Sequence, residues 1–104
     1  MGFVNSSTLP ATTSADTTVT MFNLTIATAD TEQSQALPAN TKKFLLKSRS
    51  TGIIKLAYTS GESGTKYVTI PAHGVFTDDN LYVSQTIYFQ SPTMGEIVEL
   101  ITYQ

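Results

Sequence analysis

The sequence contains no cysteine, no tryptophan and only one histidine among its 104 residues. The absence of cysteine excludes a disulfide scaffold, a thiolate zinc site and a thiol nucleophile. A single histidine excludes any metal site that is built from several imidazoles. We therefore expect a protein without metal or cofactor, and one that is not an enzyme.

Charged residues are also scarce, because they make up only 13% of the chain. Six basic and eight acidic side chains give a net charge of −2, so there is no electrostatic reason to expect nucleic acid as a partner. No apolar run approaches the roughly 18 residues that a membrane span needs, and we expect no membrane partner. No basic region followed by an apolar stretch opens the sequence, so no secretory signal is expected.

Threonine is the commonest residue, with 18 copies, and ten serines accompany it. From residue 17 onward, short runs alternate apolar and polar side chains, and turn-forming residues separate these runs. In the first run, Phe22, Leu24 and Ile26 share one face, which is typical of a half-buried strand. Residues 29–36 alone have a helical pattern, and Pro38 limits them to one short turn at most. The expected strands are 18–26, 42–47, 53–58, 67–70, 81–83, 86–90 and 96–103.

This spacing predicts an all-β fold, a single β-sandwich or jelly-roll-like domain of seven or eight short antiparallel strands over residues 17–104. Residues 1–16 are small, polar and interrupted by Pro10, so they cannot bury enough surface to fold alone. They form either a disordered tail or an extended N-terminal arm that becomes ordered on a neighbouring subunit. We adopt the arm as the working assignment.

Several polar motifs contain residue types that are found in functional sites. His73 follows a strand, with Asp78, Asp79 and Ser84 nearby in sequence, but nothing in their spacing brings them together as a triad. The run Asp78-Asp79-Asn80 offers oxygen ligands but lacks the spacing of a calcium loop, and it is ordinary turn chemistry. Glu96 and Glu99 point to opposite faces of one strand, so they do not form a glycosidase pair. We expect them to flank and solubilise that strand.

Residues 60–64 (Ser-Gly-Glu-Ser-Gly) are expected to form a glycine-bracketed hairpin loop. The tyrosines are the more informative aromatics, because tyrosine on an exposed sheet face stacks on sugars or anchors protein interfaces. The candidate interface residues, from the arm and from these tyrosines, are Phe3, Val4, Leu9, Tyr82, Tyr88 and Tyr103.

The stretch from Leu37 to Tyr103 has a distinctive succession of turn and strand motifs. LPANT leads into KKFLLKSRS, then into IIKLAYTSGESGTKYVTIPAHGVFTDDNLYVSQTIYFQSP and the closing GEIVELITY. This part of the chain resembles the small all-β structural proteins of tailed-bacteriophage virions, in which an IPA-G turn, an LY-S strand, a TIYFQS-like strand and a final EI strand recur. His73 departs from that pattern, which has a small residue or glycine there.

The resemblance implies a virion component with no catalytic residues, most simply a capsid decoration or cement protein on the capsid surface. Its partners would be the major capsid protein, other virion proteins and further copies of itself, with a trimer favoured. A neck or tail position is the alternative within the virion. The rival from another class is a carbohydrate-binding or host-recognition module, with Tyr82, Tyr88 and Tyr103 as its stacking platform.

Overall fold

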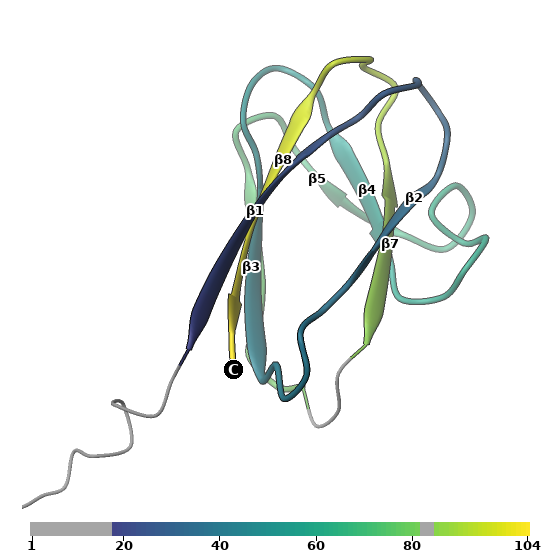
Figure 1. Ribbon diagram of the computed structural model, residues 1–104. Coiled ribbons are helices and arrows are strands. Elements are labelled where there is room, and N and C mark those ends of the chain that lie inside the picture. Colours follow the sequence, from purple (N-terminus) through teal and green to yellow (C-terminus); the bar gives the residue numbers. More distant parts are fainter. Residues whose placement is uncertain (1–17, 82–84) are drawn as a thin grey trace, which may run out of the picture.

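The computed structural model describes residues 18–81 and 85–104, which form eight strands in two four-stranded sheets (Figure 1). Sheet A contains β1 (Val19–Thr25), β3 (Lys43–Ser48), β6 (Val75–Asp78) and β8 (Ile97–Tyr103). Sheet B contains β2 (Gln33–Ala36), β4 (Ile54–Ala57), β5 (Val68–Ile70) and β7 (Thr86–Gln90). The all-β architecture predicted from the sequence is confirmed.

Every hydrogen-bonded pair of strands is antiparallel. The strand order is β1-β8-β3-β6 in sheet A and β2-β7-β4-β5 in sheet B. This order is that of a jelly roll, in which two Greek keys form a double-sheet sandwich. The predicted jelly-roll-like sandwich is therefore confirmed, whereas the arm predicted for residues 1–16 lies outside the described residues. Within the described part of the chain, no helix is long and apolar enough to cross a membrane.

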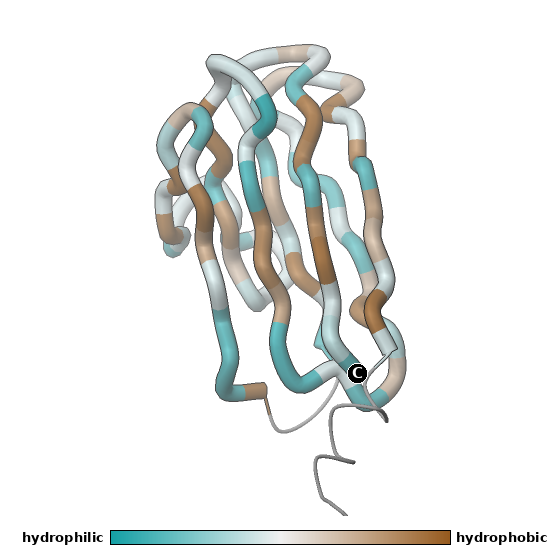
Figure 2. The backbone as a smooth tube through the Cα atoms, turned by 90° about the vertical axis from the view of Figure 1, so that its left-hand side faces the viewer, coloured by the Kyte–Doolittle hydropathy of each residue, from teal (hydrophilic) through white to brown (hydrophobic). Residues whose placement is uncertain are grey.

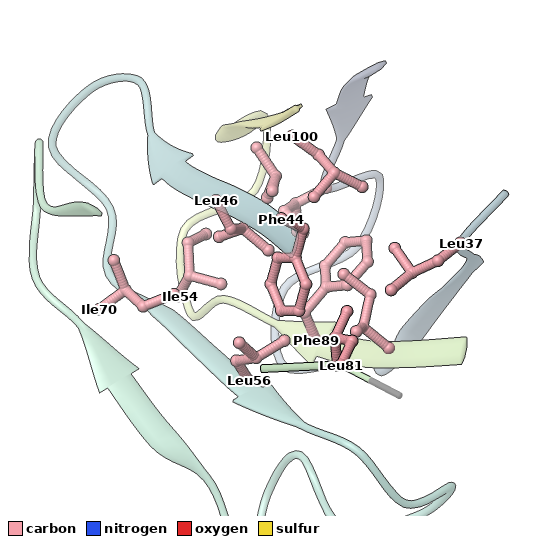
Figure 3. Packing of buried hydrophobic residues seen from close by; sticks show 12 residues of the cluster. Leu37, Phe44, Leu46, Ile54, Leu56, Ile70, Leu81, Phe89 and Leu100 are labelled. Carbon is pink, nitrogen blue, oxygen red and sulfur yellow. The ribbon is translucent and has the colours of Figure 1, made fainter. Parts of the chain in front are cut away.

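Hydrophobic residues alternate with more polar ones along several strands (Figure 2), and side chains from both sheets form the buried core. In β3, Phe44 and Leu46 point inward and are fully buried, while Leu45 points outward, as the alternation predicted. Phe44 from sheet A and Phe89 from sheet B are the largest buried side chains, and they lie near each other in the core (Figure 3). Each such side chain stabilises the fold by about 1.5–3 kcal/mol. The cluster comprises Ile26, Leu37, Phe44, Leu46, Ile54, Leu56, Ile70, Leu81, Ile87, Phe89, Val98 and Leu100.

Strand β2 replaces the helical turn that the sequence predicted within residues 29–36, and that prediction was wrong. The sequence of β2, Gln-Ser-Gln-Ala, has no apolar alternation to indicate a strand. Its backbone groups are instead satisfied by antiparallel pairing with β7. The side chain of Gln33 also donates a hydrogen bond of 3.3 Å to the carbonyl oxygen of Thr25 at the end of β1.

Strand β6 lies where the sequence predicted only a connection and a turn. It is four residues long and pairs with β3 at one edge of sheet A. A strand was predicted instead at 81–83, but Leu81 lies in no strand and is buried, with its N–H donating to the carbonyl oxygen of Lys42. Residues 82–84 lie outside the described part of the chain.

Candidate interaction surfaces

The outward side chains of sheet A include an apolar row that no described element covers. The strand register aligns Met21 of β1, Ile101 of β8 and Leu45 of β3 in one row across the sheet. Met21 is 72% exposed, and Val19 and Val75 are about half exposed. We call this side of the sheet the sheet A outer face, and polar residues such as Asn23, Lys47 and Glu99 also lie on it. Its apolar residues are Val19, Met21, Leu45, Val75, Ile97, Ile101 and Tyr103.

A compact group of charged residues lies on and beside this face. The Nε atom of Arg49 lies 2.6 Å from Oε2 of Glu99, and Nζ of Lys47 lies 3.8 Å from Oε1 of the same carboxylate. Arg49 also donates to Oδ1 of Asn23 at 3.3 Å. The hydrogen bond from Arg49 and the two nearby cations hold the pKa of Glu99 below its ordinary value. Two cations share one carboxylate, so the group keeps one net positive charge.

A hollow of about 240 Å³ lies between the apolar row and Glu99. Its floor is the backbone of β1 and β8, and its walls include Met21 and Ile101. A hollow of this size accommodates a single side chain of a partner protein.

A second groove of about 240 Å³ opens between the two sheets, at the side of the sandwich where β5 and β6 are the edge strands. The hydroxyl of Tyr58 donates to the carboxylate of Asp78 and so links the end of β4 to the end of β6. Burial, together with this carboxylate, raises the pKa of the Tyr58 phenol. The groove is lined by Leu56, Ala57, Tyr58, Lys66, Val68 and Phe76.

The structure places the candidate tyrosines apart. Tyr88 points outward from β7 in sheet B, whereas Tyr103 points outward from β8 in sheet A, so they lie on opposite faces of the sandwich. A single stacking platform cannot contain both, and that part of the sugar-binding hypothesis was wrong. Tyr103 lies under the ammonium group of Lys43, with 5.1 Å between Nζ and the ring centroid. Four candidate interface residues lie outside the described ranges: Phe3, Val4, Leu9 and Tyr82.

Glu96 is buried, with 1% of its surface exposed, although we expected it to solubilise the last strand. Its carboxylate accepts hydrogen bonds from the N–H groups of Ser50 (2.9 Å) and Gly52 (2.7 Å) and from the hydroxyls of Ser48 (3.1 Å) and Ser50 (2.9 Å). Burial by itself raises the pKa of this carboxyl, but the four hydrogen bonds together outweigh it and hold the pKa below its ordinary value. Glu96 therefore fixes the turn after β3 and is not available to a substrate.

Glu32 has a similar structural role at the loop between β4 and β5. Its carboxylate accepts hydrogen bonds from the hydroxyl and N–H of Ser63 and from the N–H of Gly61. The Ser63 hydroxyl bond is the main reason that the pKa of Glu32 is lowered. Ser63 is fully buried and lies 2.9 Å from Oε1 of Gln90, so this loop folds over sheet B. The sequence predicted the loop but not this attachment.

The remaining polar candidates do not form a site among the described residues. His73 is exposed with a φ of 60°, in a turn closed by the 2.7 Å bond from the N–H of Gly74 to the carbonyl of Pro71. Asp78 is engaged by Tyr58 and by the N–H of Asn80. Ser84 lies outside the described ranges. Within those ranges, no three or more His, Cys, Asp or Glu residues are grouped to hold a metal ion.

No protein-family model and no curated protein matches this chain. Among solved structures, a Bacillus endospore appendage, described as forming a novel family of disulfide-linked pili, is similar with a TM-score of 0.39 and 13% sequence identity. The alignment covers 85% of this chain and 86% of the other. That similarity is too low to support an inference about function.

Proposed function

We propose that this chain is a non-enzymatic structural protein of a tailed-bacteriophage virion, a decoration protein that binds the capsid shell. The observation that carries the proposal is the sheet A outer face. An apolar row of Met21, Ile101 and Leu45 crosses three strands of this face, Val19 and Val75 are also exposed, and Glu99 pairs with the nearby cations. An exposed apolar surface of this kind on a small domain is typical of a protein–protein contact. The resemblance of residues 37–103 to virion proteins suggests that the partner is the major capsid protein.

The proposed action is stabilisation of the shell by mass action. A protein that binds the assembled lattice and not its separate subunits shifts the equilibrium toward the lattice. A rigid jelly roll suits this role, because its binding face needs little ordering on contact. A position at the neck or tail would use the same face against a different virion protein.

Co-sedimentation with capsid shells tests the proposal. Purified protein is mixed with shells of the major capsid protein from the same genome, and the bound fraction is measured. We expect saturable binding, which Val75→Lys on the outer face weakens at least about tenfold. The matched control is Thr69→Lys on β5, an exposed position on the other sheet. Absence of binding, or equal loss in both variants, would contradict the proposal.

A second candidate function, sugar binding, is favoured by one observation. The groove between the sheets combines an apolar floor with the partly exposed ring of Tyr58 and the amine of Lys66. Retention on a polysaccharide column that is lost in Lys66→Ala and Tyr58→Ala would support this role. The shell-binding proposal expects no such retention.

A further inference from the structure

Strand β1 is an edge strand of sheet A, and it pairs on one side with β8 (Figure 1). The N–H of Ile26 donates to the carbonyl of Glu96, and the N–H of Gln104 donates to that of Thr18, at 2.8 Å each. In an antiparallel ladder, residues that bond to the neighbouring strand alternate with residues that do not. The residues from Thr18 to Ile26 with even numbers therefore bond to β8, and those with odd numbers direct their backbone groups to the open edge.

Three residues of β1 present free backbone groups at this edge. The carbonyl of Thr25 is occupied by the side chain of Gln33. For Val19, Met21 and Asn23, no backbone N–H or carbonyl finds a partner within residues 18–81 and 85–104. These groups form a regular template for one more strand.

The other edges of the sandwich are less suited to pairing. The edge strands β2 and β6 have four residues each and β5 has three, whereas β1 has seven. Proteins usually protect edge strands with charged residues, proline or bulges. β1 contains no charge, no proline and no glycine, and its register with β8 has no bulge. Long and unprotected, β1 is the edge at which another strand would add.

We propose that two copies of this chain join through their β1 strands, antiparallel and around a two-fold axis at Met21. In this register Val19 lies opposite Asn23 of the second copy, and Met21 lies opposite itself. All three outward-directed residues then exchange backbone hydrogen bonds. A second copy is the fitting occupant because an uncharged strand can lie against itself without like-charge repulsion. Every other described edge is too short to match it.

The pairing also completes surfaces that β1 leaves open. On the outer face, the row of Leu45, Ile101 and Met21 continues into the same row of the second copy, across one eight-stranded sheet. On the inner face, Phe22 and Leu24 pack against the core but stay half-buried, and the second copy covers their exposed sides. The pair has two-fold symmetry, and it takes the place of the trimer expected from the sequence.

Light scattering over a concentration series tests the pairing. The measurement uses only the purified chain, so its result does not depend on whether the chain binds capsid shells. We expect the wild-type protein to have the mass of a dimer. Met21→Lys places two ammonium groups together at the axis and should give a monomer at the same concentrations. Thr77→Lys, at the β6 end of the same row, should remain a dimer. Circular dichroism verifies that both variants are folded.

Removal of residues 1–17 distinguishes a dimer that forms through β1 from a dimer that forms through residues 1–17. The shortened chain should remain a dimer. A monomeric wild-type protein, a dimer that persists in Met21→Lys, or a dimer that is lost with residues 1–17 would each overturn the proposal.

Cysteine cross-linking tests the register, because the natural sequence has no cysteine to interfere. Residues opposite each other in a hydrogen-bonded pair have Cα atoms about 5.5 Å apart, which is within disulfide range. Met21→Cys should therefore oxidise to a covalent dimer. Val19→Cys on the same strand should not, because the two residues at position 19 are offset by four positions and lie more than about 13 Å apart. Equal cross-linking of the two variants would contradict the register.

Discussion

Oε1 of Glu96 lies 2.7 Å from the backbone nitrogen of Gly52, although the two residues are 44 positions apart in the sequence. The hydrogen bond joins the start of β8 to the turn that follows β3. Both partners are buried. The carboxylate thus supplies the acceptor that the buried N–H of Gly52 needs.

Replacement of Glu96 by glutamine should reduce the free energy of unfolding by about 2–3 kcal/mol. Glutamine keeps the shape but loses the charge, and its amide NH₂ faces groups that are themselves donors. Chemical denaturation at neutral pH measures the loss. Glu99→Gln is the matched control, because Glu99 lies on the outer face and its ion pairs are exposed to solvent; its effect should be much smaller. Equal losses would contradict the structural role of Glu96.

Gly52→Ala should also destabilise the fold, by about 1–3 kcal/mol. A Cβ at this position would lie 2.7 Å from Oε1 of Glu96 and 2.8 Å from Cβ of Thr93. Gly64→Ala is the control, because its Cβ would lie 3.4 Å from its nearest neighbour, the flexible side chain of Gln90. Thermal unfolding of the two variants should show a clear loss only for Gly52→Ala.

Stability should decrease in acid because the pKa values of Glu96 and Glu32 are both lowered in the folded protein. Lowered carboxyl pKa values mean that the unfolded chain binds more protons in this range. The free energy of unfolding is therefore greatest above the ordinary glutamate pKa and falls as the pH drops through the folded-state values. Denaturation at several pH values measures this slope. In Glu96→Gln the slope should be shallower, and an unchanged slope would exclude Glu96 as a cause.

Glu32→Ala should release the loop that contains Gly61 and Ser63. Three hydrogen bonds to the carboxylate are lost, and each 1.4 kcal/mol of lost stability increases the open population about tenfold. Limited trypsin digestion should therefore cut after Lys66 at least about tenfold faster. Glu62→Ala in the same loop is the control, since the Glu62 side chain makes no hydrogen bond or ion pair within the described residues. Similar rates in the two variants would contradict this attachment.

The strands with regular apolar alternation could be predicted from the sequence, and those without it could not. β1, β3 and β8 were predicted at nearly their observed positions, because their inward residues recur at every second position. β2 was missed because its strand conformation depends on pairing with β7, about 50 residues later in the sequence. β6 was missed because only Phe76 among its four residues is a large apolar side chain that points inward.

The sites were harder to predict than the strands. Strand alternation correctly separates Glu96 from Glu99, but it does not tell which carboxylate will be buried. That outcome depends on a turn more than 40 residues away, whose N–H groups and hydroxyls meet only in the folded chain. In the same way, alternation places Tyr88 and Tyr103 outward, but only the division of strands between the two sheets shows that they face opposite directions.

The position of β8 has a consequence for how the protein is made. It is the last strand in sequence, yet it lies between β1 and β3 and holds both in sheet A. Neither strand can pair with this neighbour on the ribosome until residues 97–103 have been synthesised and have left the exit tunnel. Sheet A must therefore close late, after the other seven described strands have been synthesised, with contacts of long sequence separation that slow the folding of β-proteins. Until then β1 is exposed along both of its edges in every nascent chain.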